Sequence, residues 1–125
     1  MSGKFRFVLD TNAVVSLLNG NRELAARLEK AAYVGISIIT YLEFLAFNGL
    51  TQDDRDTFQK FCARVEIVPL IHNNDLADNA LILRTLHRLK LPDAVIGATA
   101  LCRKAIIITN DSHFSGIASL SVQGC

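Results

Sequence analysis

Four acidic residues, Asp10, Glu43, Asp93 and Asp111, are placed so that a parallel sheet could bring them together. Asp10 directly follows the apolar run 7–9, which is typical of a strand covered on both faces, and Asp111 follows a second apolar run. Glu43 lies near the start of a predicted helix that follows a β-branched segment. The carboxyl ends of parallel strands, and the helix starts behind them, share one edge of a sheet. We therefore expect three of the acids at this edge, whereas Asp93 precedes its strand and is not placed by this rule.

Carboxylates gathered at one edge would repel each other, and in a cleft they would raise their own pKa values. A hard cation removes this difficulty, because Mg²⁺ and Mn²⁺ prefer oxygen ligands and accept carboxylates together with water and substrate phosphate. Such an ion can polarise a phosphodiester and lower the pKa of a bound water molecule. The four acids therefore indicate metal-assisted hydrolysis of phosphodiester bonds.

The elements that would position these acids follow an alternating order. Apolar and β-branched runs predict strands over 7–9, 33–40, 65–70, 105–109 and 120–122, the last of them a short edge strand. Capping residues and helical spacing predict pairs of helices between them, which begin near residues 11, 21, 40, 51, 74 and 91, the fifth running through Leu89. This order implies an α/β fold with a mainly parallel central sheet of four or five strands. The length of 125 residues favours a single domain over 1–125.

The spacing Thr40-x-x-Glu43 also has an interpretation without catalysis. A threonine at the start of a helix and a glutamate three residues later form a capping box, in which the glutamate reaches back to the cap. Taken alone, this spacing favours helix capping, so Glu43 becomes a candidate only together with the other acids.

The composition places few limits on partners. The formal net charge is +1, which gives no strong indication of a nucleic-acid partner, although local basic faces remain compatible with it. Three widely spaced cysteines favour neither a disulfide framework nor a zinc knuckle, and they indicate a reducing cytoplasm. No signal peptide is expected, and the longest apolar segment, 33–47, contains Glu43 and is short of a membrane span.

The contexts of the four acids resemble the four motifs of PIN-domain ribonucleases, in particular the compact VapC-type toxins of bacterial toxin–antitoxin pairs. The segments that carry the resemblance are Val8–Asn12, Thr40–Glu43, Leu91–Ala100 and Thr109–Phe114, and it extends from about Phe5 to Val122. It implies a three-layer α/β/α PIN-like fold and a metal-dependent endoribonuclease.

The same resemblance implies roles for individual residues. The catalytic quartet, which would hold Mg²⁺ or Mn²⁺ and orient the attacking water, is Asp10, Glu43, Asp93 and Asp111. Hydrogen-bonding roles around these acids are expected for Thr11, Asn12, Thr109 and Asn110.

The resemblance also implies partners: an RNA substrate, a second copy of the chain, and a small antitoxin whose segment wraps the toxin and can cover the acidic site. Apolar helix faces around Leu17, Leu45 and Phe47 are candidates for that contact. The alternative is that each of these side chains belongs to the core.

Other polar residues are weaker candidates. Arg84 and Arg88 lie four apart on the predicted helix 74–89, and we expect this pair to contact RNA phosphates, with a solvated helix face as the alternative. His113 lies two residues after Asp111, and a histidine before phenylalanine is common in the resembled pattern, so it is expected to be structural.

Alternative functions fit the sequence less well. A haloacid-dehalogenase-like phosphatase would use Asp10 as a nucleophile and needs an aspartate two residues later, where Asn12 stands. A phospho-accepting receiver domain would need a paired acid after the first strand and a lysine after a late strand. A non-catalytic PIN scaffold that binds RNA or protein would be marked by loss of acids, and none of the four is lost.

Overall fold

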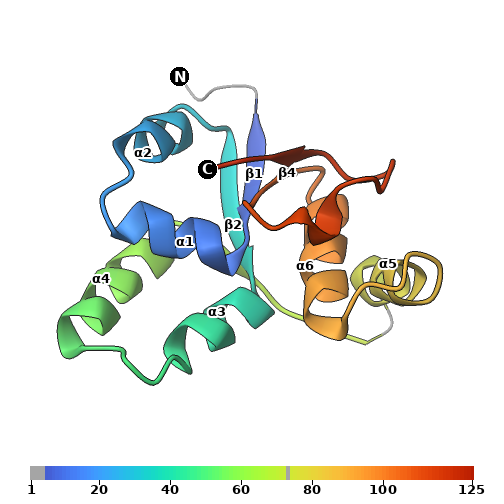
Figure 1. Ribbon diagram of the computed structural model, residues 1–125, viewed down its shortest axis with the longest axis horizontal. Coiled ribbons are helices and arrows are strands. Elements are labelled where there is room, and N and C mark those ends of the chain that lie inside the picture. The colour runs from blue at the N-terminus through green and yellow to red at the C-terminus, as the bar shows by residue number, and fades with distance from the viewer. Residues whose placement is uncertain (1–4, 73) are drawn as a thin grey trace.

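A five-stranded sheet, in which every pair of neighbouring strands is parallel, forms the middle layer (Figure 1). This computed structural model describes residues 5–72 and 74–125. The strands are β1 (Arg6–Leu9), β2 (Tyr33–Ser37), β3 (Glu66–Val68), β4 (Ile106–Ile108) and β5 (Val122–Gln123). Their order is β3-β2-β1-β4-β5, so the strand that ends at Asp10 is the central one. The predicted last strand is an edge strand, shifted by one or two residues from 120–122.

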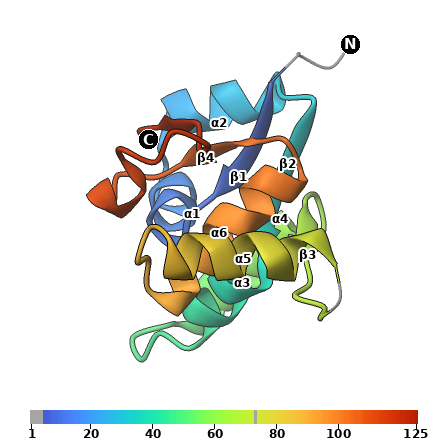
Figure 2. The same ribbon diagram turned by 90° about the vertical axis from the view of Figure 1, so that its right-hand side faces the viewer.

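Helices cover both faces of this sheet, which confirms the predicted three-layer α/β/α architecture. The helices are α1 (Thr11–Leu18), α2 (Arg22–Glu29), α3 (Ile38–Leu45), α4 (Gln52–Cys62), α5 (Asp75–Thr85), α6 (Leu91–Cys102) and the short 3-10 turn η1 (Ser112–Phe114). Figures 1 and 2 show α5 and α6 on one side of the sheet and α1, α2 and α4 on the other. The predicted order of strands and helices is confirmed throughout.

Strand β1 explains why the sheet needs two helical layers. Phe7, Val8 and Leu9 are all buried, as their uninterrupted apolar run predicts. Val8 packs with α5 and α6, whereas Phe7 and Leu9 pack with the helices of the opposite layer. Successive side chains of a strand point to opposite faces, so β1 packs into the cores on both sides of the sheet. This packing fixes the position of Asp10, which directly follows the strand.

Helix α6 lies very close to α5. Residues 94–100 of α6 are all buried, as its small side chains predict. A Cβ atom added to Gly97 would lie 2.9 Å from a methyl group of Leu83 on α5, so a larger residue at this position would have to displace the Leu83 side chain. The close contact fixes the start of α6, where Asp93 lies.

Two predicted helix boundaries are wrong. The predicted strand 33–40 ends at Ser37, whose hydroxyl caps α3 by accepting a hydrogen bond from the Ile39 N–H at 3.0 Å. Thr40 is therefore a buried residue within the helix, and the Thr40–Glu43 capping box does not form. The β-branched run favours a strand locally, but helix formation from residue 38 packs Phe44 against Phe58, with ring centroids 4.1 Å apart.

The fifth helix is the second case, because α5 ends at Thr85 and not at Leu89. Arg88 adopts a left-handed backbone conformation, with φ 58°, and the chain reverses there toward α6. The guanidinium of Arg84 donates to the carbonyl oxygen of Leu89 at 2.9 Å and stabilises this reversal. The predicted pair of Arg84 and Arg88 on one helix face is consequently wrong.

Candidate active site

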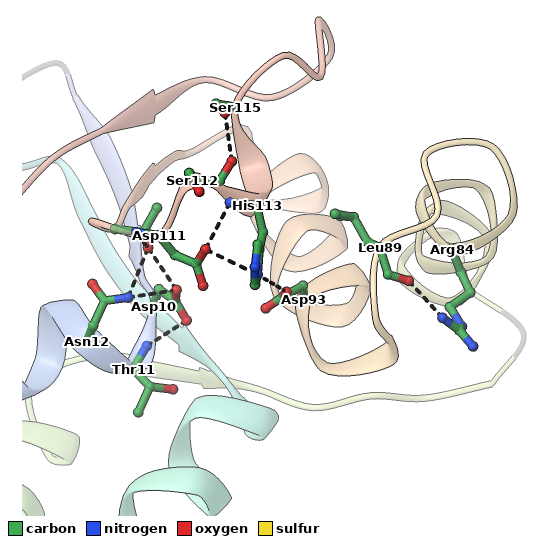
Figure 3. Close-up of polar contacts among 11 residues, drawn as sticks. Asp10, Thr11, Asn12, Arg84, Leu89, Asp93, Asp111, Ser112, His113 and Ser115 are labelled. Carbon is green, nitrogen blue, oxygen red and sulfur yellow. Dashed lines mark hydrogen bonds and ion pairs between the residues drawn. The ribbon is translucent and has the colours of Figure 1, made fainter.

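The carboxyl edge of the sheet gathers the four predicted acids, and Figure 3 shows three of them, Asp10, Asp93 and Asp111. Asp10 follows β1 and caps α1, and Asp111 follows β4 and caps η1. Asp93 lies in the first turn of α6, so its side chain reaches this edge although it precedes β4. Glu43 extends from the second turn of α3 toward the start of α1.

Asp10 is the most buried of these acids, with 5% of its surface exposed. One carboxylate oxygen accepts the backbone N–H of Thr11 at 2.7 Å. The other accepts the hydroxyl of Thr109 at 2.8 Å and the side-chain amide of Asn12 at 3.1 Å. The Asp10 carboxylate is therefore held by neutral donors from the two segments that follow β1 and β4.

The electrostatics of Asp10 are unfavourable for a free carboxylate. Burial raises its pKa above the ordinary value, and this is the largest effect. The hydrogen bonds from Thr109 and Thr11 lower the pKa, and the negative charges of Asp93 and Glu43 raise it. The net direction is upward, so the ionised form of Asp10 would gain from a nearby cation.

The hydroxyl of Thr109 connects several parts of the site. It donates to Asp10 and accepts the backbone N–H of Asp111 at 2.9 Å and the side-chain amide of Asn12 at 3.1 Å. The other end of the Asn12 amide accepts the backbone N–H of Asn110 at 3.0 Å. These contacts fix the start of α1 to the loop after β4, which sets the separation of Asp10 and Asp111.

Glu43 is the exposed member of the set. Its carboxylate accepts the hydroxyl of Thr11 at 2.6 Å, a contact across 32 residues of sequence. Thr11, Asn12 and Thr109 thus all bond directly to one of the acids, and Asn110 bonds to Asn12. Their supporting roles stay predictions.

His113 was expected to be structural, but its ring lies between two of the acids (Figure 3). The Nδ1 atom is 3.1 Å from Asp93 Oδ2 and 3.1 Å from Asp111 Oδ1. The backbone N–H of His113 also donates to Asp111 at 2.9 Å. The sequence signal for this contact was the two-residue separation from Asp111, because a 3-10 turn returns the ring toward its own cap.

The donor set of this edge fits a divalent metal ion. Asp93, Asp111 and His113 each offer a ligand atom, and these atoms all lie within 4.8 Å of one another. Within residues 5–72 and 74–125, no lysine or arginine forms an ion pair with any of the four acids. Carboxylates that pair with no lysine or arginine are ligands that Mg²⁺ and Mn²⁺ accept.

Comparison with known proteins agrees with this geometry. The PIN domain family model matches residues 7–120, almost the whole chain. The chain belongs to the PIN domain family. This is a family of nucleases, so membership supports a phosphodiester-cleaving hydrolase and confirms the resemblance found in the sequence.

Solved structures similar to this PIN domain include components of toxin–antitoxin complexes. A toxin–antitoxin complex from Klebsiella pneumoniae is 30% identical, with 90% of this chain and 93% of that chain covered and a TM-score of 0.75. VapBC-5 from Mycobacterium tuberculosis is 25% identical, with 98% and 100% covered and a TM-score of 0.65. VapBC2 from Rickettsia felis, bound to a promoter DNA fragment, has a TM-score of 0.82 over 96% and 98%, and at 21% identity it supports the fold alone. No curated protein sequence matched the chain.

Arg84 does not reach the acids of this PIN domain. Figure 3 shows its side chain directed at Leu89, and Arg88 lies in the reversal that follows α5. The geometry therefore gives neither arginine a place beside the acids, and phosphate contact by the two stays a prediction.

An apolar groove of about 390 Å³ lies beside Glu43, between α1, α3 and α4. Phe47 lines this groove with 66% of its surface exposed, and Val15 lines it from α1. Leu17 and Leu45 are half-buried and pack against the core, so for these two the core interpretation is correct. No helix in residues 5–72 and 74–125 is long and apolar enough to cross a membrane.

Proposed function

We propose that this PIN domain is a metal-dependent endoribonuclease that hydrolyses RNA phosphodiester bonds. One observation carries the proposal: four carboxylates meet at the carboxyl edge of the sheet, and the most buried of them has a raised pKa and neutral partners only. RNA, as opposed to DNA, follows from the resemblance of all four motifs to PIN-domain ribonucleases. A non-catalytic scaffold would have no need to retain such a set of acids.

In this mechanism Asp10, Asp93, Asp111 and Glu43 would hold Mg²⁺ or Mn²⁺, which would supply Lewis-acid polarisation of the phosphate and a more acidic bound water molecule. The hydroxyl of Thr109 keeps the Asp10 carboxylate oriented and fixes the backbone of Asp111. The hydroxyl of Thr11 holds the exposed Glu43 carboxylate over the same edge. The hydrogen-bonded frame thereby sets the ligand geometry before metal and RNA bind.

Cleavage of a mixed RNA pool tests the proposal. Purified protein should cut RNA with Mg²⁺ or Mn²⁺ and not with EDTA, and Asp10→Asn should lower the rate at least about 100-fold. Asp53→Asn is the matched control, because Asp53 is an exposed acid on α4. Equal cleavage by wild type and Asp10→Asn would reject the assignment. Metal binding without any cleavage would favour the scaffold.

We further propose that the chain is the toxin of a toxin–antitoxin pair, and that an apolar antitoxin segment occupies the groove beside Glu43. The similar complexes from Klebsiella pneumoniae and Mycobacterium tuberculosis support a protein partner. Exposed Phe47 and Val15 supply apolar contact area, and Glu43 offers a charge to a basic side chain. Phe47→Asp should weaken capture of the cognate partner in co-expression and leave RNA cleavage intact. Capture at the wild-type level would place the partner elsewhere.

A homodimer belongs to the same proposal. Leu81, Ile82, Leu86 and Leu91 are large apolar residues of α5, the reversal and α6, and each is more than half exposed. A second copy packed on this face would cover them. Leu86→Glu should convert a dimer to a monomer in sedimentation experiments, and an unchanged mass would reject this face. The free thiols of Cys62, Cys102 and Cys125 support action in a reducing cytoplasm.

A further inference from the structure

His113 brings a nitrogen atom into a site otherwise made of oxygen ligands. Its Nδ1 atom is equidistant, at 3.1 Å, from carboxylate oxygens of Asp93 on α6 and Asp111 after β4. The side chain is 56% exposed, so solvent and ions can reach the ring. Figure 3 shows the ring between the two carboxylates.

These separations suit ligands of one ion. Neighbouring ligand atoms around an octahedral ion with bonds of about 2.1 Å lie about 3 Å apart. Both distances from Nδ1 match that spacing, and the three ligand atoms lie within 4.8 Å of one another. An ion could therefore be bound by two oxygens and one nitrogen with little movement of the side chains.

The turn that carries His113 limits other positions of the ring. Its backbone N–H is bonded to Asp111, and the next residue, Phe114, is completely buried. Ser115 closes the turn through its hydroxyl, which donates to the Ser112 carbonyl oxygen at 2.6 Å. The ring is thus presented to the acids by a backbone that is fixed on both sides.

We propose that His113 is a metal ligand of this PIN domain and that it makes the site prefer Mn²⁺ to Mg²⁺. Mg²⁺ takes oxygen ligands and retains its water, whereas imidazole nitrogen is a better ligand for first-row transition metals. The inference rests on the proposed metal site and specifies which ion that site selects. It assigns to His113 a function in place of the structural role expected from sequence.

The alternative is that His113 only donates a hydrogen bond to the acids and occupies the place of the ion. The two arrangements predict opposite effects of removing the ring. If His113 is a ligand, its loss lowers Mn²⁺ affinity strongly and Mg²⁺ affinity little. If it occupies the ion's place, its loss raises the affinity for both ions.

Metal binding to the purified, chelator-stripped protein tests the proposal without reference to activity. Calorimetric titration should give His113→Ala and His113→Gln an Mn²⁺ affinity about tenfold below wild type, with Mg²⁺ affinity changed less than about threefold. His87→Ala is the control, because His87 is an exposed histidine at the α5 reversal. Melting temperatures without metal show whether the variants are folded.

Pulsed electron paramagnetic resonance of bound Mn²⁺ gives a direct signal. The wild type and His87→Ala should show modulation from a coordinated nitrogen, and His113→Gln should not. Bound Mn²⁺ without nitrogen modulation, or equal changes for both ions, overturns the ligand role and leaves the nuclease proposal in place. Absence of binding of either ion to the wild type overturns both.

Discussion

The two ends of the parallel sheet differ in whether their acidic residues pair with arginine. At the amino end, Glu66 at the start of β3 pairs with the guanidinium of Arg103 through contacts of 2.8 and 3.1 Å. It also accepts the hydroxyl of Tyr33, whose ring lies 4.4 Å from the guanidinium of Arg6. At the carboxyl end, four acids meet without a lysine or arginine among their described ion pairs.

The pKa directions follow this difference. The hydrogen bonds from Arg103 and Tyr33 lower the pKa of Glu66, whereas burial raises the pKa of Asp10. Arg103 neutralises the acid Glu66 at the amino end of the sheet, whereas none of the described ion pairs joins a lysine or arginine to the acids at the carboxyl end. The proposed metal ion would supply the missing positive charge at the carboxyl end, and the comparison can be tested by changing either end.

The largest expected effect is loss of the metal response at the carboxyl end. Millimolar Mg²⁺ or Mn²⁺ should raise the melting temperature of the wild type, since a ligand at 100 times its dissociation constant adds about 2.7 kcal/mol of stability. The double variant Asp10→Asn, Asp93→Asn should not respond, whereas Arg103→Ala should respond as the wild type does. A full response of the double variant in differential scanning fluorimetry would refute the comparison.

Thr11→Arg would make the carboxyl end resemble the amino end. Position 11 is 2.6 Å from the Glu43 carboxylate through its hydroxyl, so a guanidinium there can reach the acids. We expect the metal-free melting temperature to rise and the metal-induced increase to fall by about half or more. Gln59→Arg, at an exposed position of α4, is the control. An undiminished metal response would show that an arginine cannot take the place of the ion.

The raised pKa of Asp10 predicts a pH-dependent stability. Because the folded-state pKa lies above the unfolded value of about 3.9, the destabilisation is absent below that value and grows as pH rises through the folded pKa. Without metal, the stability of Asp10→Asn relative to wild type should therefore increase between pH 3 and pH 7. Urea unfolding at both pH values measures this gain, and a constant difference would contradict the prediction.

The smallest effect belongs to the amino end. Arg103→Ala should cost about 1 kcal/mol or less, because Glu66 is partly exposed and solvent screens the pair. The depressed pKa of Glu66 stabilises the fold above its unfolded value of about 4.3, and this is lost as pH falls through the folded pKa. A double-mutant cycle with Glu66→Gln isolates the pair. The absence of any measurable coupling would show that Arg103 does not neutralise Glu66, so that the two ends differ less than proposed.

Local pattern was sufficient to predict the order of elements and the edge at which Asp10, Glu43 and Asp111 lie, but it did not place Asp93 there. The consecutive apolar residues Phe7 to Leu9 can all be buried only if helices cover both faces of the sheet. This requirement made it possible to predict that Asp10 follows a buried strand. Boundaries that depend on tertiary contacts were mispredicted. The helix from Ile38 begins inside a β-branched run because Phe44 must reach Phe58, and the helix ending at Thr85 is followed by leucines that continue its spacing.

Contacts between residues that are far apart in the sequence could not be predicted from local sequence patterns. Glu66 and Arg103 are 37 residues apart and meet because their strands start at the same end of the sheet. His113 and Asp93 are 20 residues apart, and their contact depends on how closely α6 packs beneath η1. Nothing in the local sequence of either pair encodes its partner.

The bond between Thr109 and Asp10 also determines when the site can exist during synthesis. These residues are 99 positions apart, and they meet only when β4 has paired with β1. A chain that emerges from the ribosome amino end first carries Asp10 and Glu43 early, but it has neither the hydroxyl that orients Asp10 nor the acid at position 111 until residues 109–111 have been made. Long-range pairing of this kind forms late in folding. Under the proposed nuclease function, the nascent chain would therefore be unable to cut RNA, including the message being translated, until β4 has paired with β1.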